Sequence, residues 1–206
     1  MKLNTQMKST MSLAAAMGSL VLAATSANAA VIFTETFEDN DISGFSNDVE
    51  TGWVKTSSAG LVDLDDAAQF TGTGQAAWTN GTQTTTASIL SDVLAVGTTY
   101  TLSSEIAKRT DLGGTATIQL LAGTTVLDEV SATPTASDFS ESIQLIFTPD
   151  GSHAGLIGQT LAIRIGVDSV QPAFDNVVLD ATAVPEPSST ALLGLGGLAL
   201  VFRRRK

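Results

Sequence analysis

The stretch Leu161-Ala162-Ile163-Arg164-Ile165-Gly166-Val167 has the pattern that decides the fold of this chain. Its large apolar residues occupy every second position, and Arg164 lies between two of them. This period of two is expected of a strand with one buried face. The same alternation runs through residues 100–106, 116–120 and 143–147. The sequence therefore predicts several half-buried β-strands.

Further strands are predicted between Gly, Pro and Asp turn signals, whereas helix signals are weak. These strands are expected at residues 31–37, 52–56, 67–70, 75–78, 82–88, 126–130 and 173–180. Only residues 89–96 favour a short helical turn. A run of short strands without helical intervals predicts an all-β fold, an antiparallel two-sheet sandwich over residues 30–183.

The N-terminal segment has the features of an export signal. Two lysines precede an apolar stretch at residues 11–24, and Ala27 and Ala29 place small residues where a signal peptidase reads the chain. The pattern predicts a signal peptide over residues 1–29, cleaved after Ala29. Signal peptidase is therefore an expected processing partner.

The C-terminal segment, residues 184–206, joins three unlike pieces. These are Val184-Pro185-Glu186-Pro187, an apolar Gly-rich run from Ala191 to Phe202, and Arg203-Arg204-Arg205-Lys206. The prolines fix φ and favour an extended, accessible backbone. As a helix, the apolar run would span only about 18 Å of a hydrocarbon core of about 30 Å, so crossing would need flanking residues too. The four terminal cations favour the cytoplasmic side, which leaves the domain outside.

Together with the export signal, residues 184–206 resemble the PEP-CTERM sorting signal. The resemblance implies recognition of Pro185, Glu186 and Pro187 by exosortase, a membrane protease of Gram-negative bacteria that make exopolysaccharide and biofilm. It also implies that the apolar run is a single transmembrane sorting helix in the inner membrane, with the basic end as a stop-transfer anchor. After processing, the expected destination is the cell surface or the extracellular matrix.

The domain between the two signals is strongly acidic. Residues 30–183 contain 20 acidic residues and four basic ones, a net charge near −16. This charge argues against nucleic acid as a partner and is compatible with binding cations or neutral sugars. The chain has no cysteine, which excludes thiol catalysis and thiolate metal sites.

Short motifs extend the prediction to a jelly roll. Residues 33–39, 100–102, 158–165 and 174–179 resemble parts of the galactose-binding-like jelly rolls found in carbohydrate-binding modules. In such modules, the Glu after the opening Phe and an Asp of the closing strand commonly bind a structural calcium ion. The resemblance assigns these positions to Glu38 and Asp175, and calcium suits such hard oxygen ligands.

Strand parity leaves the orientation of Asp175 open. Asp175 shares one face of the closing strand with Val177 and Leu179, whereas Phe174 and Val178 share the other face. A buried carboxylate would need a cation or hydrogen-bond donors, and an Asp175 that bonds backbone amides is the alternative. In the first strand, parity turns Glu35 rather than Glu38 inward.

Sugar binding would require exposed aromatic rings that stack on pyranose faces. The candidates are Trp53 and Trp78, with Tyr100 and Phe45 beside them, and the alternative for each is a core position. No motif of a known catalytic site appears, so the chain is not expected to be an enzyme. The predicted function is an exported, non-catalytic surface or matrix protein with a structural or adhesive sandwich. The alternatives are a carbohydrate-binding module for exopolysaccharide and, third, a glycan-active enzyme.

Overall fold

The computed structural model of the chain describes residues 29–56, 58–86, 89–166 and 170–184. These residues form eleven strands and one short 3-10 helix. The elements are β1 (Ala29–Glu35), β2 (Trp53–Thr56), β3 (Ala59–Asp63), β4 (Gln75–Thr79), β5 (Thr82–Thr85), β6 (Thr98–Ala107), β7 (Ala116–Ala122), β8 (Thr125–Ala132), β9 (Glu141–Phe147), η1 (Gly151–Leu156), β10 (Leu161–Ile165) and β11 (Ala173–Ala183).

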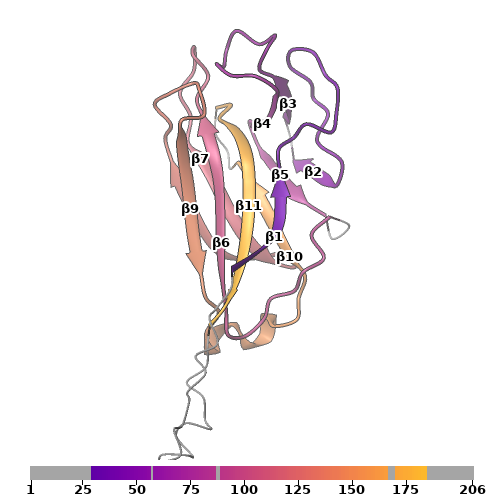
Figure 1. Ribbon diagram of the computed structural model, residues 1–206, viewed down its shortest axis with the longest axis vertical. Coiled ribbons are helices and arrows are strands. Elements are labelled where there is room, and N and C mark those ends of the chain that lie inside the picture. The colour runs from indigo at the N-terminus through magenta and orange to yellow at the C-terminus, as the bar shows by residue number, and fades with distance from the viewer. Residues whose placement is uncertain (1–28, 57, 87–88, 167–169, 185–206) are drawn as a thin grey trace, which may run out of the picture. The chain divides into compact units, whose positions relative to one another are not determined.

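The strands form two antiparallel sheets that pack face to face, as predicted (Figure 1). One sheet has the order β3-β4-β11-β6-β9, and β1 also pairs with β11. The other has the order β2-β5-β10-β7-β8. Neighbouring strands are mostly far apart in the sequence, which is the connectivity of a jelly roll. The all-β jelly-roll sandwich is therefore confirmed.

The main core lies between the two sheets and is built from the alternating residues that define the strands. On β6 and β10 every second residue is buried, as the period of two predicts. Fully buried examples are Leu102, Ile118 and Phe174, which come from β6, β7 and β11. Strand β7 is buried along both faces, because polar partners on β8 and β10 cover its outer side chains.

Three local predictions are wrong. Residues 67–70 form turns rather than a strand, since the amide of Ala67 donates to Asp63 and that of Phe70 donates to Ala67. A strand that was not predicted, β3, lies just before these turns. Residues 89–96 form no helix, and Val93 instead makes an isolated β-bridge to Thr160. Short apolar runs do not distinguish a strand from a turn that buries the same residues.

The predicted signal peptide and transmembrane sorting helix lie outside the described residues, except that Ala29 is the first residue of β1. Within the described ranges, no helix has the length and apolar character needed to cross a membrane.

Candidate functional site

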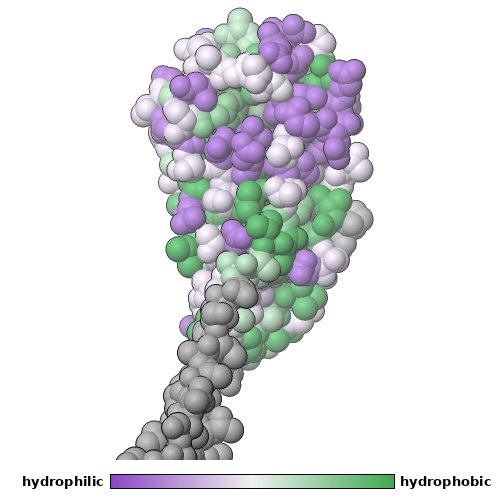
Figure 2. Space-filling view, viewed as in Figure 1, coloured by the Kyte–Doolittle hydropathy of each residue, from purple (hydrophilic) through white to green (hydrophobic). Residues whose placement is uncertain are grey.

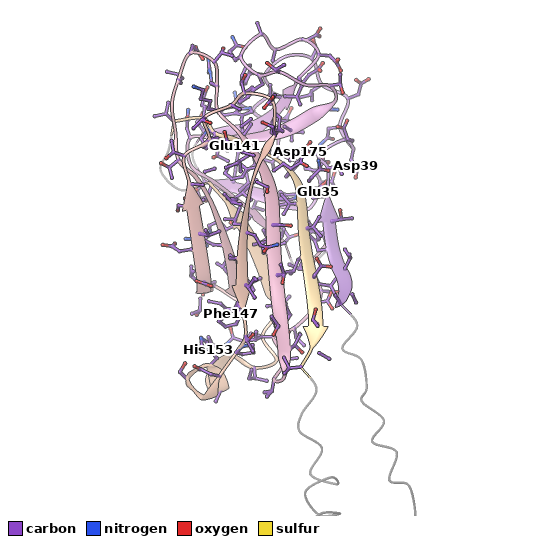
Figure 3. All side chains as sticks on the ribbon, turned by 60° about the vertical axis from the view of Figure 1, so that its left-hand side comes forward. Glu35, Asp39, Glu141, Phe147, His153 and Asp175 are labelled. Carbon is purple, nitrogen blue, oxygen red and sulfur yellow. The ribbon has the colours of Figure 1, made fainter. Side chains whose placement is uncertain are left out.

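Four carboxylates gather at one end of the sandwich and are here called the acidic cluster: Glu35, Glu38, Glu105 and Asp175. They come from the end of β1, the loop after it, β6 and β11. Figure 3 shows Glu35 and Asp175 at this end, with Asp39 nearby, and His153 at the opposite end. The charges of the three glutamates all act on Asp175, so the four groups form one electrostatic unit.

A β-bulge places Asp175 in this cluster. Asp175 pairs with Glu105, but the next matched pair is Val178 with Ser103, so β11 carries one extra residue. Asn176 takes up this residue with a left-handed φ of 47°. The bulge shifts the alternation of the strand by one residue. Phe174 before the bulge and Val177 within it therefore both point into the core. The parity that the sequence left open is thus decided by the bulge.

The environment of Asp175 favours its protonated form. Burial, together with the charges of Glu105, Glu38 and Glu35, raises the pKa of Asp175 to about 6. The amide of Asn176 donates to Oδ1 at 2.6 Å and partly offsets this shift. The Asn176 side chain also donates to Glu105 at 2.9 Å. Asp175 is therefore a half-buried carboxyl whose pKa lies well above its ordinary value of 3.8.

The carboxylate of Glu35 accepts three hydrogen bonds. Its Oε1 accepts from the amides of Thr36 at 3.0 Å and Phe37 at 2.9 Å, and its Oε2 accepts from Trp53 Nε1 at 3.1 Å. The turn that supplies these amides gives Phe37 a φ of 59° and packs its ring 5.5 Å from that of Trp53. Strand parity turns Glu35 inward, as predicted, but nothing in the sequence indicated that its carboxylate accepts these three hydrogen bonds.

Glu38 follows the same turn. Its Oε1 accepts from the amide of Gln75 at 2.8 Å, and it packs against Gly74, where any Cβ would collide with the carboxylate. Of the two residues assigned to calcium from the sequence, Glu38 lies close enough for its charge to act on Asp175. Among the described residues, no three acidic or histidine side chains are spaced for a metal ion, so calcium stays a prediction.

A second acidic feature adjoins the cluster. A cleft of about 520 Å³ opens beside β1, and Glu35 and Asp39 form its acidic part. Glu50 accepts a hydrogen bond from the amide of the cleft residue Thr51; it is 1% exposed, and its Oε2 has no hydrogen-bond partner within the described part of the chain. Sequence reasoning missed Asp39, Glu50 and Glu105, because nothing local marks one acid among 20.

The two candidate sugar-stacking residues are core residues in the structure. Trp53 and Trp78 are each 4% exposed. The indole of Trp78 donates to the carbonyls of Ser46 at 3.0 Å and Leu61 at 2.9 Å. Neither ring offers a face to a sugar, so the expectation that they bind a glycan is corrected here.

Of the expected processing residues, only two lie within the described ranges. Val184 donates its amide to Gly97 at 2.7 Å, directly after β11, and Ala29 begins β1. Ala27, the Pro185-Glu186-Pro187 motif and the basic end Arg203 to Lys206 lie outside the described residues.

Fold and site together define a jelly-roll β-sandwich domain with an acidic end. The family model described as HpiC1 cyclase matches residues 28–180, and the chain belongs to this HpiC1-like family. A second model, the PEP-CTERM protein-sorting motif, matches residues 183–206. This motif implies export to the cell envelope and processing by exosortase, as expected from the sequence.

Solved structures with a similar fold include two cyclases. The chain is similar to the Stig cyclase Fisc from Fischerella sp. TAU, with 21% identity, a TM-score of 0.62, and coverage of 77% of this chain and 100% of that one. It is similar to an apo cyclase from Fischerella sp., with 23% identity, a TM-score of 0.61, and coverage of 77% and 98%. The CBM22-1 xylan-binding domain from Paenibacillus barcinonensis gives 11% identity, a TM-score of 0.45, and coverage of 76% and 97%. No curated protein matches the chain.

Proposed function

We propose that this chain is a non-catalytic protein of the cell surface or extracellular matrix, in which the sandwich has a structural or adhesive role. The observation that carries the proposal is the position of the sorting motif. The motif matches residues 183–206, so it begins at Ala183, the last residue of β11. Strand β11 pairs with β1, β4 and β6. The sandwich is thus joined to the tail through a strand held along both edges, which suits a domain displayed on a membrane or matrix.

The sorting step is tested by mass spectrometry of a Gram-negative host that encodes an exosortase. Protein found outside the cell should lack Arg203 to Lys206. Replacing Pro185, Glu186 and Pro187 by Ala should leave the tail intact and keep the protein with the inner membrane. Ser188→Ala, a change just after the motif, should be processed normally. An intact basic end on wild-type protein outside the cell would contradict the proposal.

We further propose that Glu38 and Asp175 hold one structural calcium ion. The residues fit the ion in two ways. Among the described residues, Glu38 Oε2 accepts no hydrogen bond, and Asp175 Oδ2 has only a 3.5 Å contact with Asn176. Gly74 leaves room for the Glu38 carboxylate where a side chain would collide with it. A divalent cation would also offset the repulsion among the four carboxylates of the acidic cluster.

Thermal melts with saturating calcium and with chelator test this assignment. Calcium should raise the midpoint of wild-type protein. Asp175→Asn should lose the shift, and Asp128→Asn, which removes an acid from β8, should keep it. A wild-type midpoint that is the same with calcium and with chelator would argue strongly against a structural ion.

A cyclase-type activity is the second candidate. Two observations favour it: membership in the HpiC1-like family, and a half-buried Asp175 that can hold a proton near pH 6. One similar Fischerella cyclase was crystallised with 4-(1H-indol-3-yl)butan-2-one, which serves as a probe. Saturable NMR shifts around Asp175 on adding this compound would support the candidate. No shift up to the solubility limit would remove that support.

A further inference from the structure

The cleft beside β1 combines an apolar wall with an acidic rim. Ile32, Phe33 and Ile89 supply the wall, and Glu35 and Asp39 supply the carboxylates. Its volume of about 520 Å³ falls within the range of small-molecule sites, roughly 300–1,000 Å³. In Figure 2 the face that carries β1 is mostly hydrophilic in its upper half and more hydrophobic below. The cleft therefore offers both kinds of contact to one ligand.

Glu50 adds a buried acidic group that is hydrogen-bonded to a residue of the cleft. Its Oε1 accepts from Asn40 Nδ2 at 2.9 Å and from the amide of Thr51, a cleft residue, at 2.8 Å. Its Oε2 is buried and unpartnered within the described part of the chain. A buried carboxylate oxygen without a hydrogen-bond donor is costly, and protonation or a nearby cation would lower that cost.

Within the described ranges, none of these three acids forms an ion pair. Burial raises the pKa of Glu50, the charges of Glu35 and Asp39 raise it further, and the backbone amides of Thr51 and Asp39 partly offset this. The ion pairs found among the described residues are Arg109–Asp111 and Asp150–His153, neither of which lines the cleft. The negative charge at this cleft is therefore uncompensated by the described part of the chain.

The geometry suits an organic cation better than a metal ion. Both oxygens of Glu35 already accept N–H bonds of 2.9–3.1 Å, which leaves little room for a metal ion to coordinate them. A carboxylate oxygen has two lone pairs, so an ammonium can share it with an amide. Charge-assisted bonds of this kind are about 2.8 Å long and stronger than neutral ones.

We propose that the cleft binds a primary ammonium group attached to an apolar or aromatic body. Asp39 and Glu35 hold the ammonium, and Glu50, on which the charges of both residues act, adds to the acidic environment. The body lies on Ile32, Phe33 and Ile89. Asp39 is exposed and accepts no hydrogen bond through its side chain from the described residues, so it is the group free to bind.

Titration of the full chain with phenethylammonium tests this proposal, with 2-phenylethanol and 3-phenylpropanoate as neutral and anionic probes of matched shape. Only the ammonium should bind saturably, as followed by calorimetry in chelator. It should also change the fluorescence of Trp53, whose indole donates to Glu35. Asp39→Asn should weaken binding at least about five-fold, the loss expected for one charge-assisted bond.

The control is Asp128→Asn, which removes the same charge from the edge strand of the second sheet and should leave affinity unchanged. Equal losses in the two variants would show only diffuse attraction to an acidic protein and would overturn the proposal. So would equal binding of the alcohol, or no saturable binding of the ammonium. Because chelator is present throughout, these outcomes do not bear on the calcium assignment.

Discussion

Asp175 of β11 lies directly opposite Glu105 of β6, so two carboxylates face each other across an antiparallel ladder. Like charges in this position destabilise a sheet. Asn176 connects them, because its amide bonds Asp175 and its side chain bonds Glu105. The bulge thus places the carboxylates of Asp175 and Glu105 opposite each other, and its residue Asn176 supplies hydrogen bonds that stabilise both of them.

Removing the charge of Asp175 should stabilise the calcium-free protein at neutral pH. The folded-state pKa of about 6 lies above the ordinary 3.8, so the folded state binds this proton more tightly than the unfolded state does. Its stabilising contribution is present below about pH 4 and is lost as the pH rises to about 6. Asp175→Asn should therefore gain about 1 kcal/mol at pH 7, a value discounted for partial exposure.

Urea unfolding in chelator between pH 4 and pH 8 measures this difference. The wild-type stability should contain a decline between pH 4 and pH 6 that the variant lacks. Parallel pH profiles for the two proteins would contradict the raised pKa.

The left-handed backbone at Asn176 predicts that alanine destabilises the protein more than glycine at this position, the reverse of the usual order within a strand. Asn176→Gly and Asn176→Ala both lose the side-chain bond to Glu105, so their difference isolates the backbone. Ala in this region costs roughly 1–2 kcal/mol that Gly does not. Asn176→Ala should therefore be less stable than Asn176→Gly in urea. Equal stabilities would mean that the φ of 47° is not maintained.

Replacing the buried carboxylate of Glu50 by the amide of glutamine should stabilise the protein. Glu50→Gln keeps an oxygen for Asn40 and Thr51 and removes a charge beside Glu35 and Asp39. We expect a gain of about 1 kcal/mol in chelator without added amine. Glu50→Ala loses both hydrogen bonds and leaves a cavity, so it should lose about 2 kcal/mol or more. A Gln variant as unstable as the Ala variant would contradict the unpartnered Oε2.

Gly60 of β3 should not tolerate a side chain. A Cβ there would collide with the backbone carbonyl of Ser46 and lie 2.9 Å from the Cα of Asn47. Gly60→Ala should therefore cost about 2–3 kcal/mol, measured by thermal or urea unfolding. Gly151→Ala is the matched control, because its Cβ meets no atom within 4 Å and should change stability by no more than about 0.5 kcal/mol. Similar losses in both variants would argue against this close packing of β3.

Much of the fold was predictable because strand patterns are local. The alternation in residues 100–106 and 161–165 fixes which side chains of β6 and β10 face the core, and the structure buries those residues. Strand β3 was missed and residues 67–70 were misassigned, because short apolar runs also occur where turns bury their residues. The buried positions of Trp53 and Trp78 depend on partners from distant segments.

The sequence by itself determined the all-β class and the sorting motif, because alternation and motif are properties of neighbouring residues. It also proposed Glu38 and Asp175 as a pair through a family resemblance. Only the tertiary structure decided that the bulge at Asn176 turns Asp175 toward Glu105, and that Glu50 is buried close to the charges of Glu35 and Asp39. The physical reason is that electrostatic energy depends on distances between groups far apart in the chain, which strand register and loop packing set.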